Sequence, residues 1–288
     1  MTSKPRLLYM HIPKTGGSTL RVIAERQYPR SNRLNINQDA LEENLKILQD
    51  MSQVQRDKIN CVIGHLYFGI HHLFPNGENA YMTMLRHPVK RMISNYYFTR
   101  TKPFHRHYDM ARNRSLLEYS EHPGVQSLAT RYIAGLTGTT PETLKIINIA
   151  DEATLEKAKA NLRDHYKVIG FTEEFDASLL MMKKPLGWEN IYYYALNTSD
   201  NFRKKEPREK MTPELIEALE AACPLDMALH RYALELYEAQ KDAYGRDKLA
   251  ADLAIFQRMN QRISPFLALT RRLRKTRLYR GIRQRLKL

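Results

Sequence analysis

Short apolar runs alternate with longer segments of helical spacing over much of this chain. The short runs are rich in Leu, Ile, Val, Tyr and Met and stop at turn-forming or charged residues, which is typical of strands buried in a sheet. They lie at residues 7–12 (LLYMHI), 61–65 (CVIGH), 80–85 (AYMTML) and 167–172 (KVIGFT). Strands that alternate with helices favour a parallel sheet covered by helices on both faces, so we expect an α/β fold.

Helices are expected where apolar residues recur every three or four positions. Pro88 suits the first position of a helix, and Ser18 and Thr19 suit a helix N-terminus. Residues 101–122 are rich in His, Arg and Asn and are expected to form an irregular connection. The helical segments are residues 18–26, 38–51, 88–100, 128–136, 151–166 and 174–184, and the chain from Pro213 onward.

The chain is expected to form one domain followed by a tail. Its 288 residues are enough to bury a full core, and no internal repeat divides them. We place the domain at residues 1–262, with an α/β core over about 6–200 and a helical extension over about 212–262. Residues 263–288 form a basic tail.

Charge separates that tail from the body. The formal net charge is +15, and eleven Lys or Arg with no Asp or Glu lie between Leu253 and Leu288. Without these eleven, 35 basic residues stand against 31 acidic ones, so the rest carries only +4. A nucleic-acid partner is therefore not indicated, because the excess charge is confined to one end.

Three roles for the tail stay open. Leu278, Tyr279, Ile282 and Leu286 would share one face of a helix with basic residues opposite, and such a segment can lie on an anionic membrane surface. The tail could equally guide an anionic glycan, or be a solvated end.

Composition favours a soluble protein in a reducing compartment. No run approaches a membrane span of about 18 apolar residues, and no signal-peptide pattern precedes the first strand. Cys61 and Cys223 lie far apart, which indicates neither a zinc site nor a disulfide framework. We expect a cytoplasmic protein, peripheral at the inner membrane if the tail binds lipid.

The segment HIPKTGGST (residues 11–19) joins the first expected strand to the first expected helix. Gly16 and Gly17 permit a sharp turn that brings backbone N–H groups close to a ligand. The helix N-terminus adds donors and partial positive charge, and Lys14 adds a full charge. These features favour a phosphate-like anion. The alternative is an ordinary strand-to-helix turn with a solvated lysine.

A second anion site is expected in LRHPVKRMISNYY (residues 85–97). Arg86 leaves the carboxyl end of a strand, where α/β sheets bind ligands. Ser94 lies on the following helix, with Arg91 one turn before it on the same face. A guanidinium and a hydroxyl near a helix start can bind a second phosphate. In the alternative, Arg86 pairs with a carboxylate and Ser94 faces solvent.

Together the two segments resemble the sulfotransferase superfamily, most closely the carbohydrate branch that includes the uronyl 2-O-sulfotransferases. Further similar stretches are VIGHLYFGIHH (62–72), TRYIAG (130–135) and the region 158–188, and the resemblance covers about residues 6–200. It implies a P-loop-like parallel sheet and the donor 3′-phosphoadenosine-5′-phosphosulfate (PAPS), with no metal. It also implies a carbohydrate or lipid-linked saccharide as acceptor.

The resemblance implies roles for the residues of both segments. Arg86 and Ser94 would hold the 3′-phosphate of PAPS. Lys14 would also stabilise negative charge on the bridging oxygen as the sulfuryl group leaves. The 5′-phosphosulfate would be held by Lys14, Thr15, Gly16, Gly17, Ser18 and Thr19.

Among ten histidines, His65 is the expected base for the acceptor hydroxyl. It follows Gly64 at the end of a strand, on the donor edge of the sheet, and matches the base position of the family. The alternative is a hydrogen-bonded histidine near the core. Arg131 could meet an anionic acceptor such as a uronic acid, or form a structural ion pair. His11 is expected to pack against the loop or orient it.

Two other functions compete with sulfuryl transfer. A P-loop kinase or NTPase has its lysine after the glycines, whereas Lys14 precedes Gly16. Asp and Glu are also absent from residues 80–108, so no acidic strand end is available there for Mg²⁺. A non-catalytic basic protein could bind membranes or polyanions through the tail, but it would not need two anion sites.

Overall fold

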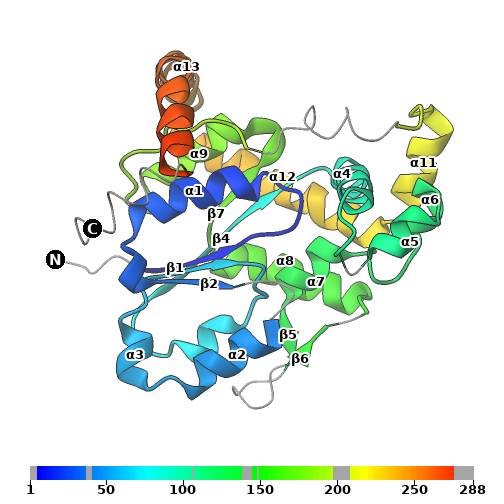
Figure 1. Ribbon diagram of the computed structural model, residues 1–288, viewed down its shortest axis with the longest axis horizontal. Helices are drawn as coiled ribbons and strands as arrows, with labels where there is room; N and C mark the ends of the chain where they lie inside the picture. The colour runs from blue at the N-terminus through cyan, green and yellow to red at the C-terminus, as the bar shows by residue number, and fades with distance from the viewer. Residues whose placement is uncertain are drawn as a thin grey trace.

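Five parallel strands form the centre of the molecule. The computed structural model describes residues 5–36, 41–105, 107–137, 145–147, 149–196 and 208–275. Across the sheet the strands follow the order β2-β3-β1-β4-β7, and each neighbouring pair is parallel (Figure 1). Their bounds are β1 (Arg6–Met10), β2 (Arg33–Ile36), β3 (Cys61–Gly64), β4 (Asn79–Leu85) and β7 (Tyr166–Phe171).

Helices pack on both faces of this sheet, which confirms the expected α/β fold with a parallel sheet and C-terminal helices. Figure 1 shows α1 and α9 on one side and α2, α3 and α8 on the other. The helices are α1 (Gly17–Gln27), α2 (Leu41–Asp50), α3 (Gln53–Asp57), α4 (Pro88–Arg100), α5 (Tyr108–Arg112), α6 (Leu116–Ser120), α7 (Leu128–Ala134), α8 (Glu152–His165), α9 (Phe175–Lys183), α11 (Pro213–Ala221), α12 (Pro224–Tyr244) and α13 (Arg246–Lys275). Short 3₁₀ turns are η1 (Arg30–Asn32), η3 (Ile70–Leu73) and η5 (Thr172–Glu174), and β5 (Leu136–Thr137) pairs with β6 (Lys145–Ile146).

The register of the sheet aligns the carboxyl ends of three strands. Met10 of β1 lies between Gly64 of β3 and Thr83 of β4, and the Thr83 hydroxyl donates to the Met10 carbonyl at 2.9 Å. The residues that leave these strands therefore emerge along one edge of the sheet. This edge is where an α/β protein binds its ligand.

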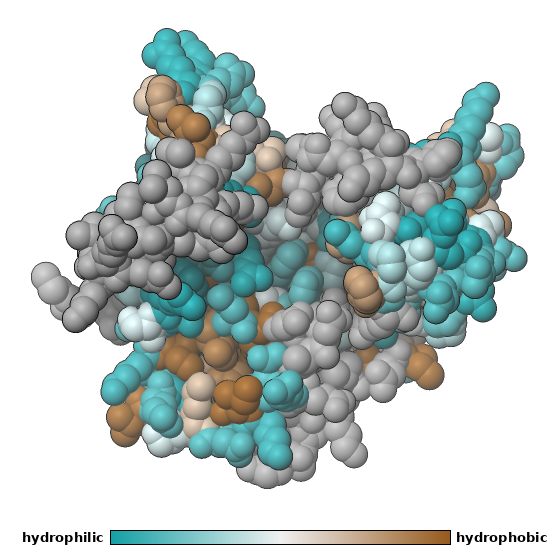
Figure 2. Space-filling model, viewed as in Figure 1, coloured by the Kyte–Doolittle hydropathy of each residue, from teal (hydrophilic) through white to brown (hydrophobic). Residues whose placement is uncertain are grey.

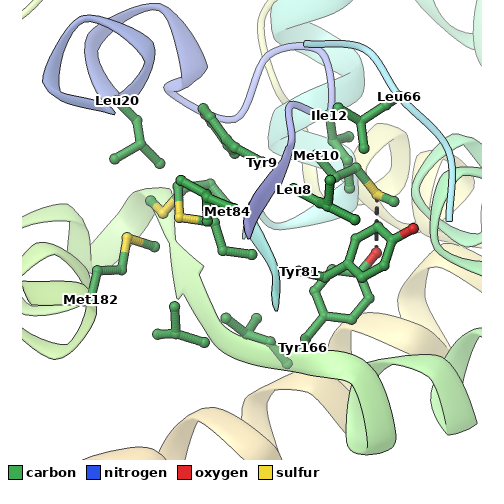
Figure 3. Close-up of a cluster of buried hydrophobic side chains, with 14 of the residues drawn as sticks. Leu8, Tyr9, Met10, Ile12, Leu20, Leu66, Tyr81, Met84, Tyr166 and Met182 are labelled. Atoms are coloured by element: carbon green, nitrogen blue, oxygen red, sulfur yellow. Dashed lines mark hydrogen bonds between the residues drawn. The ribbon is translucent and has the colours of Figure 1, made fainter. Parts of the chain in front are cut away.

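The main hydrophobic core lies between the sheet and its helices. Figure 3 shows side chains of β1, β4 and β7 packed together there, with Leu20 of α1 and Met182 of α9 beside them. The Tyr166 hydroxyl donates to the Met10 sulfur at 3.2 Å, so a buried phenol has a partner. Removing these side chains from water supplies most of the free energy that favours folding.

A second hydrophobic cluster joins α4 to α5, α6 and α11, which Figure 1 shows at one end of the molecule. The expectation of an irregular connection over residues 101–122 is therefore wrong in part, since it contains α5 and α6. Ser115 caps α6 by accepting from the Glu118 N–H, while the Glu118 carboxylate accepts from the Ser115 N–H. Leu116 and Tyr119 are fully buried against α4, which gives this short helix its stability.

The C-terminal part is helical, as expected. Helix α13 continues past residue 263, where the sequence predicts the start of the tail, and contains Pro265. The predicted apolar positions at 278–286 lie outside the described residues. Among the helices that the structure describes, none is both long and apolar enough to cross a membrane.

Candidate active site

The loop between β1 and α1 folds back sharply before the helix begins. Lys14 and Gly16 both have left-handed backbones, with φ of 70° and 76°. The Thr15 hydroxyl donates to the Ile12 carbonyl at 2.7 Å, and the Thr19 N–H donates to the Gly16 carbonyl at 3.1 Å. The Thr15 hydroxyl thus holds the turn. Left-handed backbone is unusual for lysine, and such positions are most frequent at functional sites.

The two glycines of the loop are needed for different reasons. Gly16 has the left-handed conformation, and a Cβ atom there would lie 3.3 Å from the Phe175 ring. A Cβ atom on Gly17 would lie 1.8 Å from Nε2 of His11, far inside ordinary contact. The imidazole of His11 therefore occupies the space that any larger residue at position 17 would fill.

Lys14 is held in a partly buried, cationic environment. Its ammonium lies 3.9 Å from the centre of the Phe98 ring. Burial, together with the positive charges of Arg86 and Lys102, lowers the pKa of Lys14 to about 8. A bound anion would relieve this repulsion.

Arg86 brings the second segment to the first. Its Nη1 donates to the carbonyl oxygen of Lys14 at 3.2 Å. Burial lowers the pKa of Arg86, the nearby Glu173 raises it, and Arg208 and Arg91 lower it. Glu173 also accepts from the His87 N–H at 3.1 Å. A carboxylate is therefore present near Arg86, as the alternative interpretation of this segment expects.

Arg208 belongs to the same cationic group, although no motif in the sequence predicts it. It follows a charged stretch with no motif, yet its guanidinium lies 5.0 Å from the centre of the Tyr97 ring on α4. The Tyr97 hydroxyl accepts from the N–H of Glu209 at 2.8 Å, which fixes this segment against α4. Ser94 is half-buried in the second turn of the same helix.

Arg91, one turn before Ser94 on α4, is held by a carboxylate of another helix. It is 1% exposed, and its Nη2 lies 3.3 Å from Oδ2 of Asp226 on α12. Asp226 also accepts from the Thr130 N–H at 2.9 Å and the Thr130 hydroxyl at 2.8 Å. Because α4 packs inward on this side, Arg91 joins α4, α7 and α12 through one buried carboxylate.

His65 lies at the end of β3 beside the loop. Its Nδ1 is 2.7 Å from the carbonyl oxygen of His11. A carbonyl only accepts, so Nδ1 carries the proton and Nε2 keeps its lone pair. The two imidazoles stack with their centres 4.5 Å apart. Burial holds the pKa of His11 well below its ordinary value, so His11 stays neutral beside Lys14.

Arg131 is 8% exposed and donates through Nη2 to the Gly124 carbonyl at 3.1 Å. Burial lowers its pKa, while Tyr67 and Asp226 raise it.

Comparison with known proteins gives the family. Residues 2–271 match the description of the galactose-3-O-sulfotransferases over almost the whole chain. The chain belongs to this family. The resemblance to the carbohydrate branch of the sulfotransferases is thereby confirmed.

Relatives of this galactose-3-O-sulfotransferase family member are distant. The galactosylceramide sulfotransferase of Bos taurus is 24% identical over 194 residues, which cover 64% of this chain and 44% of the relative. The heparan sulfate 2-O-sulfotransferase 1 of Gallus gallus is 20% identical over 262 residues, which cover 84% of this chain and 73% of the relative. The chain thus spans less than half the length of the bovine relative. The solved structure of mouse sulfotransferase SULT7A1 complexed with PAP is similar at 11% identity and a TM-score of 0.40. The match covers 81% of this chain and 90% of the SULT7A1 chain.

Two further histidines of this family member lie at different distances from the candidate site. His105 packs against Phe98, whose ring also lies beside Lys14, so His105 is close to the candidate site. The Nδ1 of His71 lies 3.0 Å from the Tyr81 hydroxyl, near the amino end of β4 and away from the loop edge. Among the described residues, no group of three or more His, Cys, Asp or Glu is arranged to hold a metal ion.

Proposed function

We propose that this protein moves the sulfuryl group of PAPS to a hydroxyl of a carbohydrate or glycan-like acceptor. The observation that carries the proposal is the hydrogen bond from Arg86 to the Lys14 carbonyl at 3.2 Å. It joins two anion-binding segments that lie far apart in the sequence. Family membership supports the same reaction.

The donor fits a group of cations that repel one another in its absence. Lys14 and the N-terminal turn of α1 bind the 5′-phosphosulfate, because the helix start supplies N–H donors and positive potential. Arg86 and Ser94 bind the 3′-phosphate, and Arg208 adds charge on the same side. The lowered pKa values of Lys14 and Arg86 support this assignment, since a bound anion would favour both charged forms.

The transfer itself needs a base and a group that stabilises the leaving oxygen. Nε2 of His65 accepts the proton of the acceptor hydroxyl as the new bond from oxygen to sulfur forms. The bond from sulfur to the bridging phosphate oxygen breaks at the same time. Lys14 stabilises the negative charge that appears on that oxygen. Stacking on neutral His11 keeps the ring of His65 in place.

The acceptor is proposed to be a glycan or a lipid-linked saccharide, in keeping with the galactosylceramide and heparan sulfate named for the relatives. Arg131 remains a prediction as an acceptor contact. The cytoplasmic setting and the contact of residues 263–288 with an anionic membrane remain predictions as well.

Mass detection of sulfated product from PAPS and a panel of glycans tests the reaction. His65→Ala should lower turnover by about 10²–10⁴-fold while leaving the affinity for 3′,5′-ADP unchanged. Lys14→Ala should lower turnover by about 10²–10³-fold, more than it weakens that affinity. His72→Ala replaces an exposed histidine and serves as the matched control.

The competing nucleotide chemistry is tested by thermal shift. The proposal predicts stabilisation by 3′,5′-ADP without metal. A larger shift with ATP and Mg²⁺ would favour a P-loop kinase or NTPase. Normal turnover in the His65→Ala variant would remove His65 from its role as base.

A further inference from the structure

Helix α13 has a second apolar face that does not contact the core. Its inner face buries Leu249 and Phe256 against the body. Two hydrogen bonds attach the same side of α13 to the body. Asn260 Oδ1 accepts from the Tyr193 N–H at 2.7 Å. Arg271 Nη1 donates to the Tyr194 hydroxyl at 2.6 Å. The inner face of α13 therefore packs against the body of the molecule.

The second face, here called the outer stripe, consists of Ile255, Met259, Phe266 and Leu269. Phe266 is 69% exposed, and Ile255 and Leu269 are each 54% exposed. Their spacing of four, seven and three residues aligns them along one side of an α-helix. Figure 1 shows α13 projecting from the body, and Figure 2 shows apolar residues next to polar ones on this projection.

Positive charge surrounds the outer stripe. Arg258 and Arg262 are exposed and lie beside it on the helix. From Leu253 to Lys275 the helix contains no Asp or Glu, and the sequence keeps this bias to Leu288. The surface that covers the stripe must therefore be apolar inside and anionic at its rim.

A second copy of this chain does not meet that requirement. A symmetric dimer through the stripe would bring the same patch of each copy together, so the arginines of one copy would approach those of the other. Such juxtaposition of like charges opposes association, and no acidic residue of α13 beyond Asp252 compensates for it. Folding residues 276–288 onto the stripe would add more cations to it, with the same result.

We propose that the outer stripe docks on an anionic lipid surface. Phe266 and Leu269 enter the boundary between headgroups and acyl chains, and Arg258 and Arg262 bind the lipid phosphates. The proposal assigns the membrane contact predicted for residues 263–288 to a defined face of α13, and it does not depend on sulfuryl transfer.

Vesicle flotation tests this docking with the full chain. The vesicles are phosphatidylcholine alone, or equal parts of phosphatidylcholine and phosphatidylglycerol. The chain should float only with the anionic vesicles, and the double variant Phe266→Ser, Leu269→Ser should bind them at least about tenfold more weakly, because two large apolar side chains no longer leave water. Val54→Ser on α3, where Val54 is 67% exposed, should bind like the wild type. Each variant should keep its melting temperature.

Three results would overturn the proposal. The first is equal binding by the wild type and the double variant, which would assign lipid contact to the basic charge alone. The second is no flotation of the wild type with anionic vesicles. The third is a dimer in light scattering that the double variant dissociates, which would make a second copy the occupant. When the chain is shortened to end at Lys275, the double substitution should still weaken binding to anionic vesicles. If it no longer does, residues 276–288 cover the stripe.

Discussion

Substitution of Gly17 by alanine probes the contact on which the arrangement of the candidate site depends. Gly17 is the first residue of α1, and its backbone φ is not left-handed, so alanine is compatible with the backbone itself. The added Cβ atom would nevertheless lie 1.8 Å from Nε2 of His11, whereas ordinary contact begins at 3.4 Å. The imidazole of His11 would have to move by more than an ångström. It is stacked on His65, so the movement cannot stay local.

The size of the effect follows from two opposing contributions. Overpacking of this kind costs about 1–3 kcal/mol. Alanine in place of glycine in a helix returns about 0.5–1 kcal/mol. Gly17→Ala should therefore lower the free energy of unfolding in the wild type. In the His11→Ala background the clash is absent, and the same substitution should raise the free energy of unfolding by a few tenths of a kcal/mol or more.

A double-mutant cycle measured by urea denaturation gives the coupling between the two positions. We expect about 1–3 kcal/mol, which is the clash itself, with a change of sign between the two backgrounds. Gly77→Ala is the control, because Gly77 has φ of +84° and nothing lies within 4 Å of the added Cβ atom. Its strain should be equal in both backgrounds. A coupling below about 0.5 kcal/mol for Gly17 would refute the placement of the His11 ring against the loop.

Three further predictions concern charge. Because the pKa of Lys14 is lowered to about 8, the ammonium loses its charge as the pH rises through that value, and the affinity for 3′,5′-ADP should fall. Calorimetry should show no such decrease for the Lys14→Arg variant, which stays charged. Asp226→Asn should lower the free energy of unfolding by about 3–5 kcal/mol in urea, since it breaks the buried pair with Arg91, whereas Glu25→Gln in an exposed pair should change it by about 1 kcal/mol or less. Burial, with His72 and His165 nearby, lowers the pKa of His71 from 6.5 to about 4, so the neutral imidazole stabilises the fold above pH 6.5 and this contribution is lost as the pH falls toward 4. Over that pH range the melting temperature of the His71→Asn variant should therefore fall less than that of the wild type.

The sequence was most informative where local chemistry decides the structure. The apolar run before Pro13 favours a buried strand, the two glycines permit the sharp turn that follows it, and Pro88 suits the first position of a helix, so β1, α1 and α4 appear as predicted. The position of Lys14 relative to Arg86 follows from these elements, because parallel strands bring their carboxyl ends to one edge.

Long-range packing could not be predicted in this way. Strand β2 has only four residues, and most of its side chains are partly exposed, so its apolar signal is weak. Asp226 lies in α12, and nothing in its local pattern shows that it meets Arg91 from a helix more than a hundred residues earlier. Arg208 reaches the candidate site through a contact with Tyr97, which depends on how the chain returns to α4.

The conformation of Lys14 bears on the proposed binding of a donor with two anionic groups. With φ of 70°, the backbone turns so that the Lys14 carbonyl accepts from Arg86, while its ammonium lies by Phe98. A guanidinium has five N–H donors, and this bond uses one of them, so Arg86 can be positioned by the loop and still bind a phosphate. This hydrogen bond ties the guanidinium of Arg86 to the loop that carries Lys14. A loop that fixes both cations in this way is suited to a ligand with two anionic groups at a constant separation, and less suited to a single phosphate.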